Sequence, residues 1–432
     1  MKKLVAIAIL FIMACGSGKQ VVRETAVRES TAPAELVKIK KEILNAPGAP
    51  EPFYKMGMYY LGVDSALSAI AYFDSALYFD PGYTAAQLER ATARIALGDF
   101  MSGYDEYLTI LKSERGDEYA ADIAKRTGQP HPIVQLTAGE YNNAYATYSP
   151  VGDVIAFQSD RTLNWDLYVM DENGSRDSSI TDHPEHDEMP VFSPNGEFIT
   201  FTSTRDDTGK EDRVDTYRNI YLLDLQNDIE ARVTEYAGDD WYPAFTNKDN
   251  EILFVSEKDD PRDVEFQDRW SDIYRKNLKD GSVIRLTQNQ ADDGTPAVTR
   301  DGKWILFSSN RDGMYQIYRM NRKGNVIERL TFIDGNCSAP HISHDGRKIV
   351  FSAEVNGNYD IYMMQISGKK LMRMTCDPAQ DGYPCFSPDG TRIIFHSNRR
   401  GKFQIFWIDL LNTPSQVEVV RLLEDRMTSL KE

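Results

Sequence analysis

Between residues 148 and 399 the chain repeats one pattern of apolar and polar positions six times. In its clearest copy, YPCFSPDGTRIIFHSNR at residues 383–399, two segments of alternating apolar residues flank a Pro-Asp-Gly turn. Alternation with a period of two residues is typical of β-strands, and Gly390 supplies the positive φ that a tight turn needs. Each copy is therefore predicted to form a β-hairpin. The other five copies begin at Tyr148, Phe192, Phe245, Val298 and Ile342.

A third apolar segment follows each hairpin, and a fourth follows in the first five copies. In the first copy these are Leu167-Tyr168-Val169 and a segment that ends in Ile180-Thr181. Four short strands in a repeat of roughly 40–45 residues are typical of one blade of a β-propeller. The pattern predicts a mainly β protein, with a six-bladed propeller of four-stranded blades at residues 129–423 and a short tail at 424–432.

The repeat resembles that of the TolB family of propellers, also known as the PD40 repeat. Its signature is Leu-Thr, then Pro, then Ser-Pro-Asp-Gly, then Phe-x-Ser-x-Arg, and the resemblance covers residues 136–423. The resemblance implies the propeller fold. It leaves the function open, because propellers serve both as enzymes and as binding scaffolds.

A helical domain is predicted before the propeller, at residues 33–128. Leu36, Ile39 and Ile43 have the spacing of one helix face. The stretch from Pro50 resembles a tetratricopeptide repeat, in which Gly57 would allow two helices to approach closely. A second, weaker copy follows at residues 84–117.

The inner face of these helices would carry Tyr54, Met58 and Leu61 from the first repeat. Leu88, Thr92 and Ile95 would follow from the second repeat. Two interpretations remain open: this face forms a peptide-binding groove, or it packs against another part of the chain.

The first residues have the features of a targeting segment. Lys2 and Lys3 precede a run of ten apolar residues, which is too short to span a bilayer. The following Ile12-Met13-Ala14-Cys15 resembles a bacterial lipobox, which implies cleavage before Cys15 and lipid attachment to its sulfur. We therefore expect a lipoprotein signal peptide at 1–14, a lipidated tether at 15–32 and a periplasmic location, at the outer rather than the inner membrane. An ordinary signal peptide is the alternative.

Composition narrows the classes of partner. The chain has 432 residues and a formal net charge of −17, without a basic stretch, which argues against binding to nucleic acid. Nucleotide-binding and Gly-x-Ser-x-Gly motifs are absent from the sequence, so we predict no cofactor, no metal and no catalytic residue. Cys376 and Cys385 either form a disulfide or remain free and buried.

Two repeats are longer than the others by roughly nine residues, and longer loops on a repeat scaffold often mark its binding face. The additional residues fall at 206–218 and 258–271, after the second strand. Tyr217, Phe266 and Trp270 are interleaved with charges there and are predicted to contact a partner. The alternative is that the loops are exposed to solvent and have no binding role.

An acid and a base recur at fixed positions in the repeat. The acids are Asp187, Asp240, Asp293 and Asp381, and the bases are Arg161, Arg205, Arg311 and Arg399, with Lys258 at the third position. Blade five has Cys337 and Val355 instead, so both charges are lost together. This suggests structural pairs that hold loops; the alternative is a carboxylate ring that binds a cation. A loop with His183 and His186 is a weaker metal candidate.

The lipid anchor, helical repeats and propeller together resemble PorE-type envelope lipoproteins of Bacteroidota. Those proteins continue into an OmpA-like domain that this sequence does not show, so we expect no peptidoglycan contact. The leading hypothesis is a non-enzymatic, lipid-anchored scaffold that binds proteins of the cell envelope. The alternatives are a propeller enzyme similar to polysaccharide lyases, and a sensor that binds a small ligand or cation in its channel.

Overall fold

The computed structural model describes residues 33–205, 218–235, 238–260, 262, 264 and 269–431. The chain divides into two units, Met1–Tyr119 with Leu422–Glu432, and Ala120–Arg421. The predicted signal peptide and tether, including Cys15, lie outside the described residues. Across the parts that are described, no helix is both long and apolar enough to cross a bilayer.

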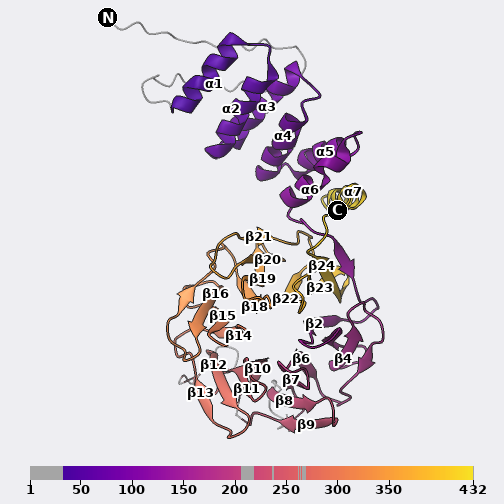
Figure 1. The fold of residues 1–432 in the computed structure, drawn as a ribbon, viewed down its shortest axis with the longest axis vertical. Coiled ribbons are helices and arrows are strands. Elements are labelled where there is room, and N and C mark those ends of the chain that lie inside the picture. Colours follow the sequence, from indigo (N-terminus) through magenta and orange to yellow (C-terminus); the bar gives the residue numbers. More distant parts are fainter. Residues whose placement is uncertain are drawn as a thin grey trace, which may run out of the picture. The chain divides into compact units, whose positions relative to one another are not determined.

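Within the described residues, six helices precede the propeller (Figure 1). They are α1 (Ala34–Asn45), α2 (Pro50–Gly62), α3 (Ala66–Phe79), α4 (Thr84–Ala96), α5 (Phe100–Leu111) and α6 (Gly116–Arg126). From α1 to α5, consecutive helices pack on one another, most extensively α2 on α3 and α4 on α5. The predicted helical domain is confirmed, whereas its assignment to the tetratricopeptide class stays a prediction.

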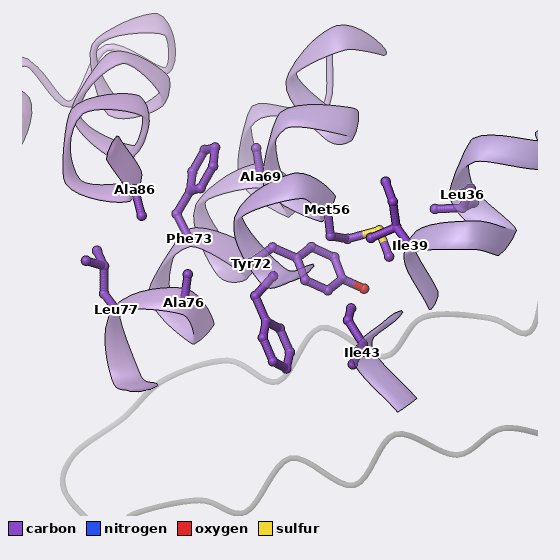
Figure 2. Close-up of a cluster of buried hydrophobic side chains, with 11 residues drawn as sticks. Leu36, Ile39, Ile43, Met56, Ala69, Tyr72, Phe73, Ala76, Leu77 and Ala86 are labelled. Carbon is purple, nitrogen blue, oxygen red and sulfur yellow. The ribbon is translucent and has the colours of Figure 1, made fainter. Parts of the chain in front are cut away.

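Apolar side chains from α1 to α4 form the core of the helical unit (Figure 2). Small residues allow the close approach of α2 and α3. A Cβ atom on Gly57 would lie 2.4 Å from Cε1 of the fully buried Phe73. A larger residue there would push the helices apart. The sequence pattern had indicated this role for Gly57.

Six four-stranded antiparallel sheets surround a central channel and confirm the predicted propeller (Figure 1). Blade one is β2 (Asn143–Tyr148), β3 (Val154–Ser159), β4 (Asp166–Asp171) and β5 (Ser178–Ser179); blade two is β6 (Asp187–Phe192), β7 (Phe198–Ser203), β8 (Asn219–Asp224) and β9 (Ile229–Arg232); blade three is β10 (Asp240–Phe245), β11 (Glu251–Ser256), β12 (Asp272–Asn277) and β13 (Val283–Arg285). Blade four is β14 (Asp293–Val298), β15 (Trp304–Ser309), β16 (Gln316–Asn321) and β17 (Glu328–Arg329); blade five is β18 (Cys337–Ile342), β19 (Lys348–Val355), β20 (Asn358–Gln365) and β21 (Met372–Arg373); blade six is β22 (Asp381–Phe386), β23 (Arg392–Arg400), β24 (Lys402–Asp409) and β1 (Ile133–Gln135).

The same side chains fill the space between all the blades. The second strand contributes a fully buried phenylalanine, and the third strand places an aromatic ring opposite it, as in the pairs Phe307–Tyr318 and Phe395–Phe406. The threonine that ends each repeat accepts a backbone N–H from the third strand, as Thr331 does from Ile317 at 2.8 Å. Because every blade buries the same side chains and satisfies the same polar groups, the repeat can be recognised in the sequence.

The ring closes with a strand from the beginning of the propeller. β1 pairs with β24 in antiparallel register, and Thr137 accepts the N–H of Ile405 at 2.8 Å, as its equivalents do in the other blades. The sequence analysis had recognised fourth strands in five blades and had not found this one. Only three residues form β1, and its partner lies at the other end of the propeller sequence.

The end of the chain differs from the expected tail. The sequence analysis assigned residues up to 423 to the propeller and residues 424–432 to a tail. The structure instead has a helix across this boundary, α7 (Gln416–Ser429). Val419 and Leu423, four positions apart, are both buried, which explains the helix as an amphipathic one. The propeller strands themselves end with β24.

Candidate functional site

One end of the propeller carries the connections between second and third strands and the connections between successive blades. We call this end the loop face, with residues 160–165, 257–260, 310–315 and 354–359 among its members. The opposite end carries the Ser-Pro-Asp-Gly turns, such as the turn at 387–390. The antiparallel order of the strands requires this division.

Three of the recurring acids meet their recurring bases at the loop face. Arg Nη2 lies 2.6 Å from the carboxylate in the pair Asp187–Arg205, 2.8 Å in Asp293–Arg311 and 2.9 Å in Asp381–Arg399. Each of these aspartates is fully buried. Each guanidinium also lies over aromatic rings of its own blade. These carboxylates are thus engaged within their blades.

The remaining positions are arranged differently. Arg161 donates to Asn143 at 3.3 Å and also pairs with Asp177. In blade three, the Lys258 ammonium lies 4.4 Å from the centre of the Tyr274 ring. Burial raises the pKa of the Asp240 carboxyl to about 6, against the influence of nearby hydroxyls and of Lys258. Asp240 and Lys258 are therefore not arranged like the acid–base pairs of the other three blades.

The histidines of the candidate metal loop both accept backbone hydrogen bonds. His186 Nδ1 accepts the N–H of Trp165, and His183 Nδ1 accepts that of Glu185, each at 3.1 Å. The residue before the first strand makes the same bond in every blade; its other occupants are Asn142, Asp239, Asp292, Asn336 and Gln380. His186 thus has a structural role shared by all blades. Among the described residues, no group of three or more His, Cys, Asp or Glu side chains is placed to hold a metal ion.

Trp270 is half-buried and held by its own loop. The Arg262 guanidinium lies 3.4 Å from the centre of its ring, and its N–H donates to Asp260 at 2.7 Å. Although burial opposes it, the hydrogen bonds from Arg262 and Trp270 lower the pKa of Asp260 to about 2. The other two aromatic residues predicted to contact a partner, Tyr217 and Phe266, lie outside the described residues.

Leu163 is a surface feature that the sequence analysis missed. It follows the second strand of blade one, is 98% exposed, and has a φ of 82°. The same position of the repeat holds Gly313, Gly357 and Gly401, each also with positive φ. Left-handed backbone is strained for a leucine, by roughly 1 kcal/mol. A comparison of the aligned repeats, with glycine in three copies and leucine in one, could have found it.

Other large apolar side chains are exposed on the same face. Phe332, in the connection between blades four and five, is 77% exposed, and Met314 of blade four is also exposed. The Arg329 guanidinium lies 4.8 Å from the centre of the Phe332 ring. An apolar side chain with a polar rim is typical of a contact point in a protein interface.

Three tyrosines narrow the central channel. Each first strand has a β-bulge with a residue of positive φ, and in blades one, three and six this residue is Tyr145, Tyr242 or Tyr383. The hydroxyls of Tyr242 and Tyr383, from opposite blades, are 2.8 Å apart, and the Tyr145 ring lies 4.1 Å from that of Tyr383. His396 beside them accepts the N–H of Tyr145 at 3.2 Å, and burial lowers its pKa to about 4. Neutral, apolar rings thus occupy the channel at this level.

The predicted groove of the helical unit is only partly present. Met58 lines a groove between α1 and α2 with Lys38 and Lys55. Tyr54 and Leu61 pack against the core instead. In the second repeat, Leu88 is buried, the Thr92 hydroxyl lies 2.8 Å from that of Tyr107 on α5, and Ile95 packs against Gly103, so these three face their own helix pair. The packing interpretation therefore describes most of this face.

Among the described residues, Cys337, Cys376 and Cys385 form no disulfide. The alternative of a disulfide between Cys376 and Cys385 is therefore not the arrangement observed. Burial raises the pKa of the Cys337 thiol to about 11.

Comparison with known proteins identifies the propeller repeat. A family profile described as "PD40: TolB beta propeller domain" matches residues 333–426. The chain is 27% identical over 205 residues to the "Uncharacterized peptidase YuxL" of Bacillus subtilis, covering 47% of this chain and 27% of that protein. It is 36% identical over 159 residues to the "Uncharacterized protein Atu1656" of Agrobacterium fabrum, covering 36% of this chain and 50% of that protein. The matched region thus spans half or less of each relative.

Solved structures that structural comparison matches to this chain include TolB from Acinetobacter baumannii. That structure has a TM-score of 0.46 and 21% identity, covering 68% of this chain and 69% of its own. An oligogalacturonate lyase in complex with manganese has a TM-score of 0.46 and 14% identity, covering 67% of this chain and 95% of its own. The profile match places residues 333–426 in a segment of the TolB PD40 type, and the strand order shows a six-bladed β-propeller of four-stranded blades, preceded by a helical region.

Proposed function

We propose that the protein is an interaction scaffold of the bacterial cell envelope and that the loop face of its propeller binds another protein. The observation that carries this proposal is Leu163. A leucine that is almost fully exposed in a strained conformation, where three other blades use glycine, stabilises neither the blade nor its surroundings. An exposed leucine at this position is explained if the side chain inserts into an apolar pocket of a partner.

The surroundings of Leu163 fit such an interface. Asn164 donates to the carbonyl groups of His183 and Glu185, at 2.7 and 3.0 Å, which fixes the turn that presents the leucine. Preorganised loops bind with a smaller loss of conformational entropy than mobile loops. Phe332 and Met314 are exposed at blade four, across the ring from Leu163, and add apolar area elsewhere on the loop face.

The polysaccharide-lyase alternative requires histidines that are available to a metal at the propeller. His183, His186 and His396 already accept backbone N–H groups through Nδ1. Those bonds support a structural role for these rings and favour the scaffold over the lyase. A catalytic activity of another kind would need a site that the sequence motifs do not indicate.

A pair of variants tests the role of Leu163. Leu163→Gly should keep or slightly raise the melting temperature, because glycine relieves the strain, and should weaken binding to the partner. A photo-crosslinking residue at position 163 in intact cells should give a discrete adduct that the same residue at Arg347, an exposed position at the opposite end, does not give. Identical adduct patterns from both positions, or binding unchanged by Leu163→Gly, would contradict the proposal.

The envelope location rests on the lipobox-like sequence before Cys15. We expect Cys15→Ser to release the protein from the membrane fraction or to block its processing. Fractionation of cells with mass spectrometry of the N-terminal peptide measures both. An unmodified cysteine in a wild-type protein that remains with the membrane would remove the lipid anchor from the proposal and leave the role of Leu163 untouched.

A further inference from the structure

A ring of six equivalent side chains lines the inner strands of the propeller. Its members are Thr147, Val191, Ala244, Ala297, His341 and Cys385, each paired with the equivalent residue of its second strand. The first strands contact one another around the channel, so the ring passes through successive blades. Its three polar members, His341, Cys385 and Thr147, lie on the consecutive blades five, six and one. The proposed interface at the loop face does not use them.

His341 and Cys385 are in direct contact. His341 Nε2 lies 3.5 Å from Cys385 Sγ. The backbone N–H of Phe386 donates to His341 Nδ1 at 3.2 Å. Because Nδ1 accepts this bond, the neutral imidazole carries its proton on Nε2, which then points at the sulfur. The ring is thus fixed as a hydrogen-bond donor to Cys385.

Further groups from blade one face the same sulfur. The Thr147 hydroxyl lies 3.9 Å from Cys385 Sγ, and the backbone N–H of Tyr148 also faces it. Burial alone would raise the pKa of the Cys385 thiol, but the imidazole of His341 and these donors lower it below its usual value. Cys337, buried without an imidazole beside it, has a pKa raised to about 11. The two buried cysteines therefore differ through their neighbours.

The fixed tautomer argues against a metal at this pair. A metal on His341 Nε2 would displace the proton from that nitrogen while Nδ1 still accepts the N–H of Phe386. The imidazole would then have to bind as an anion. A thiolate that receives a hydrogen bond has no such conflict.

We propose that Cys385 is a nucleophilic thiolate in the propeller channel and a site of modification by small disulfides. Its sulfur attacks one sulfur of the reagent, so that a new bond to Cys385 Sγ forms as the disulfide bond of the reagent breaks. The leaving thiolate departs with the electron pair and takes a proton from water. His341 stabilises the Cys385 thiolate before the attack.

The size of the reagent is limited by the channel. Cys385 is only 6% exposed, whereas His341 and Thr147 beside it are half-buried. Ala244, on the blade opposite to Cys385, and Ala297 carry small side chains, which leave room for a small reagent. The rings of Tyr242 and Tyr383, which meet in the same channel, restrict that room. Small reagents are therefore expected to react and bulky ones to be excluded.

The experiment uses the full chain with Cys15→Ser and Cys376→Ser, so that only Cys337 and Cys385 remain. The probe is 2,2′-dithiodipyridine, a small neutral disulfide, and peptide mass spectrometry assigns the modified cysteine. Cys385 should react at least about tenfold faster than Cys337 at neutral pH, with a pH midpoint below the value of about 8.5 of an ordinary thiol. Equal rates for the two cysteines, or a midpoint at or above that value, would overturn the proposal.

His341→Ala separates the thiolate from simple accessibility. The ring already holds alanine at this position in blades three and four, which favours folding of the variant. The pH midpoint should rise and the rate at neutral pH fall about tenfold, while the limiting rate at high pH is retained. The titratable groups that face Cys385 are His341 on β18 and the Tyr148 hydroxyl on β2, whose pKa burial raises far above the neutral range. A pH profile unchanged by His341→Ala in a folded variant would contradict the role of the imidazole. If the variant does not fold, the pH midpoint of Cys385 in the chain with His341 intact decides whether Cys385 is a thiolate near neutral pH.

Discussion

Blades four and five connect their second and third strands in different ways. In blade four the strands β15 and β16 stop early, and residues 310–315 form a loop held by the pair Asp293–Arg311. In blade five the charged pair is replaced by Cys337 and Val355, and the strands β19 and β20 run on for eight residues each. Their hairpin closes at Asn356-Gly357, where both residues have positive φ.

The difference shows that the ion pair and the extended hairpin are two means of closing the same connection. Asn-Gly with positive φ at both positions is the signature of a type I′ turn, which matches the twist of the flanking strands and needs no side chain to hold it. A longer loop lacks those backbone bonds and is fixed by the buried carboxylate and guanidinium. Blade six combines both devices, with long strands and the pair Asp381–Arg399.

The largest effect is expected when the ion pair of blade four is broken on one side. Arg311→Ala leaves Asp293 fully buried without its guanidinium, which should lower the free energy of unfolding by about 3–5 kcal/mol. Asp293→Ala should be damaging for the converse reason. Denaturant unfolding of the two variants measures both effects.

The double variant Asp293→Ala with Arg311→Ala provides the control, since blade five also lacks both charges. It should lose less stability than the two single changes added together, because neither charge is then left alone. Strictly additive losses would mean that the two residues do not stabilise the loop as a pair.

A smaller, pH-dependent effect is expected in blade three, where Glu257 occupies the position of Glu354 in blade five. Glu354 accepts a hydrogen bond from Asn336 at 2.8 Å, whereas Glu257 Oε2 is buried with no hydrogen-bond partner among the residues that the structure describes. Burial, together with Asp239 and Asp292, raises the pKa of Glu257 to about 8. The folded state therefore favours the protonated acid, and its stability should fall as the pH rises towards 8.

Glu257→Gln keeps the neutral form at every pH. It should raise the free energy of unfolding at pH 8 by about 1–3 kcal/mol, at about 1.4 kcal/mol for each pKa unit, discounted for relaxation of the site. The gain should shrink as the pH approaches 5. Thermal unfolding at both pH values measures this, with Glu354→Gln as the matched control, for which no such gain is expected; an equal gain at both pH values would contradict the assignment.

The smallest effect concerns the turn of blade five. Gly357→Ala meets no neighbouring atom within 4 Å, so its consequence is backbone strain alone, at a φ of 81°. A loss of about 1 kcal/mol is expected. Leu163→Gly is the reverse change at the equivalent position of blade one and should have the opposite sign. If both variants lost stability to the same extent, backbone strain would not explain Leu163.

The sequence predicted the fold well because the same requirement is met six times. Phe395 and its equivalents must be buried, and Gly390 must allow a turn, so the pattern is visible without a structure. β1 was missed because three residues carry too little alternation to mark a strand and because its partner is distant in the chain. The contact of His341 with Cys385 was missed for a related reason, since the repeat register places both at one ring position but does not reveal which way each side chain turns.

Repeat position alone was also insufficient at the loop face. It placed Asp240 and Lys258 where Asp293 and Arg311 lie, yet the ammonium of Lys258 lies over the Tyr274 ring. A lysine offers one compact charge, whereas an arginine offers a planar group that bonds the carboxylate while lying over aromatic rings. Pairing at this position therefore depends on the kind of base as well as on its charge.

The closure of blade six by β1 imposes an order on synthesis. β1 leaves the ribosome before any other strand of the propeller, and its partner β24 leaves after all the others. Blades one to five can each complete their own sheets as they emerge, while β1 remains without its partner for almost the entire translation of the domain. At about 5–20 residues per second this interval amounts to tens of seconds. The last blade is thus the one in which the beginning and the end of the propeller must find each other, and it sets the moment at which the ring becomes complete.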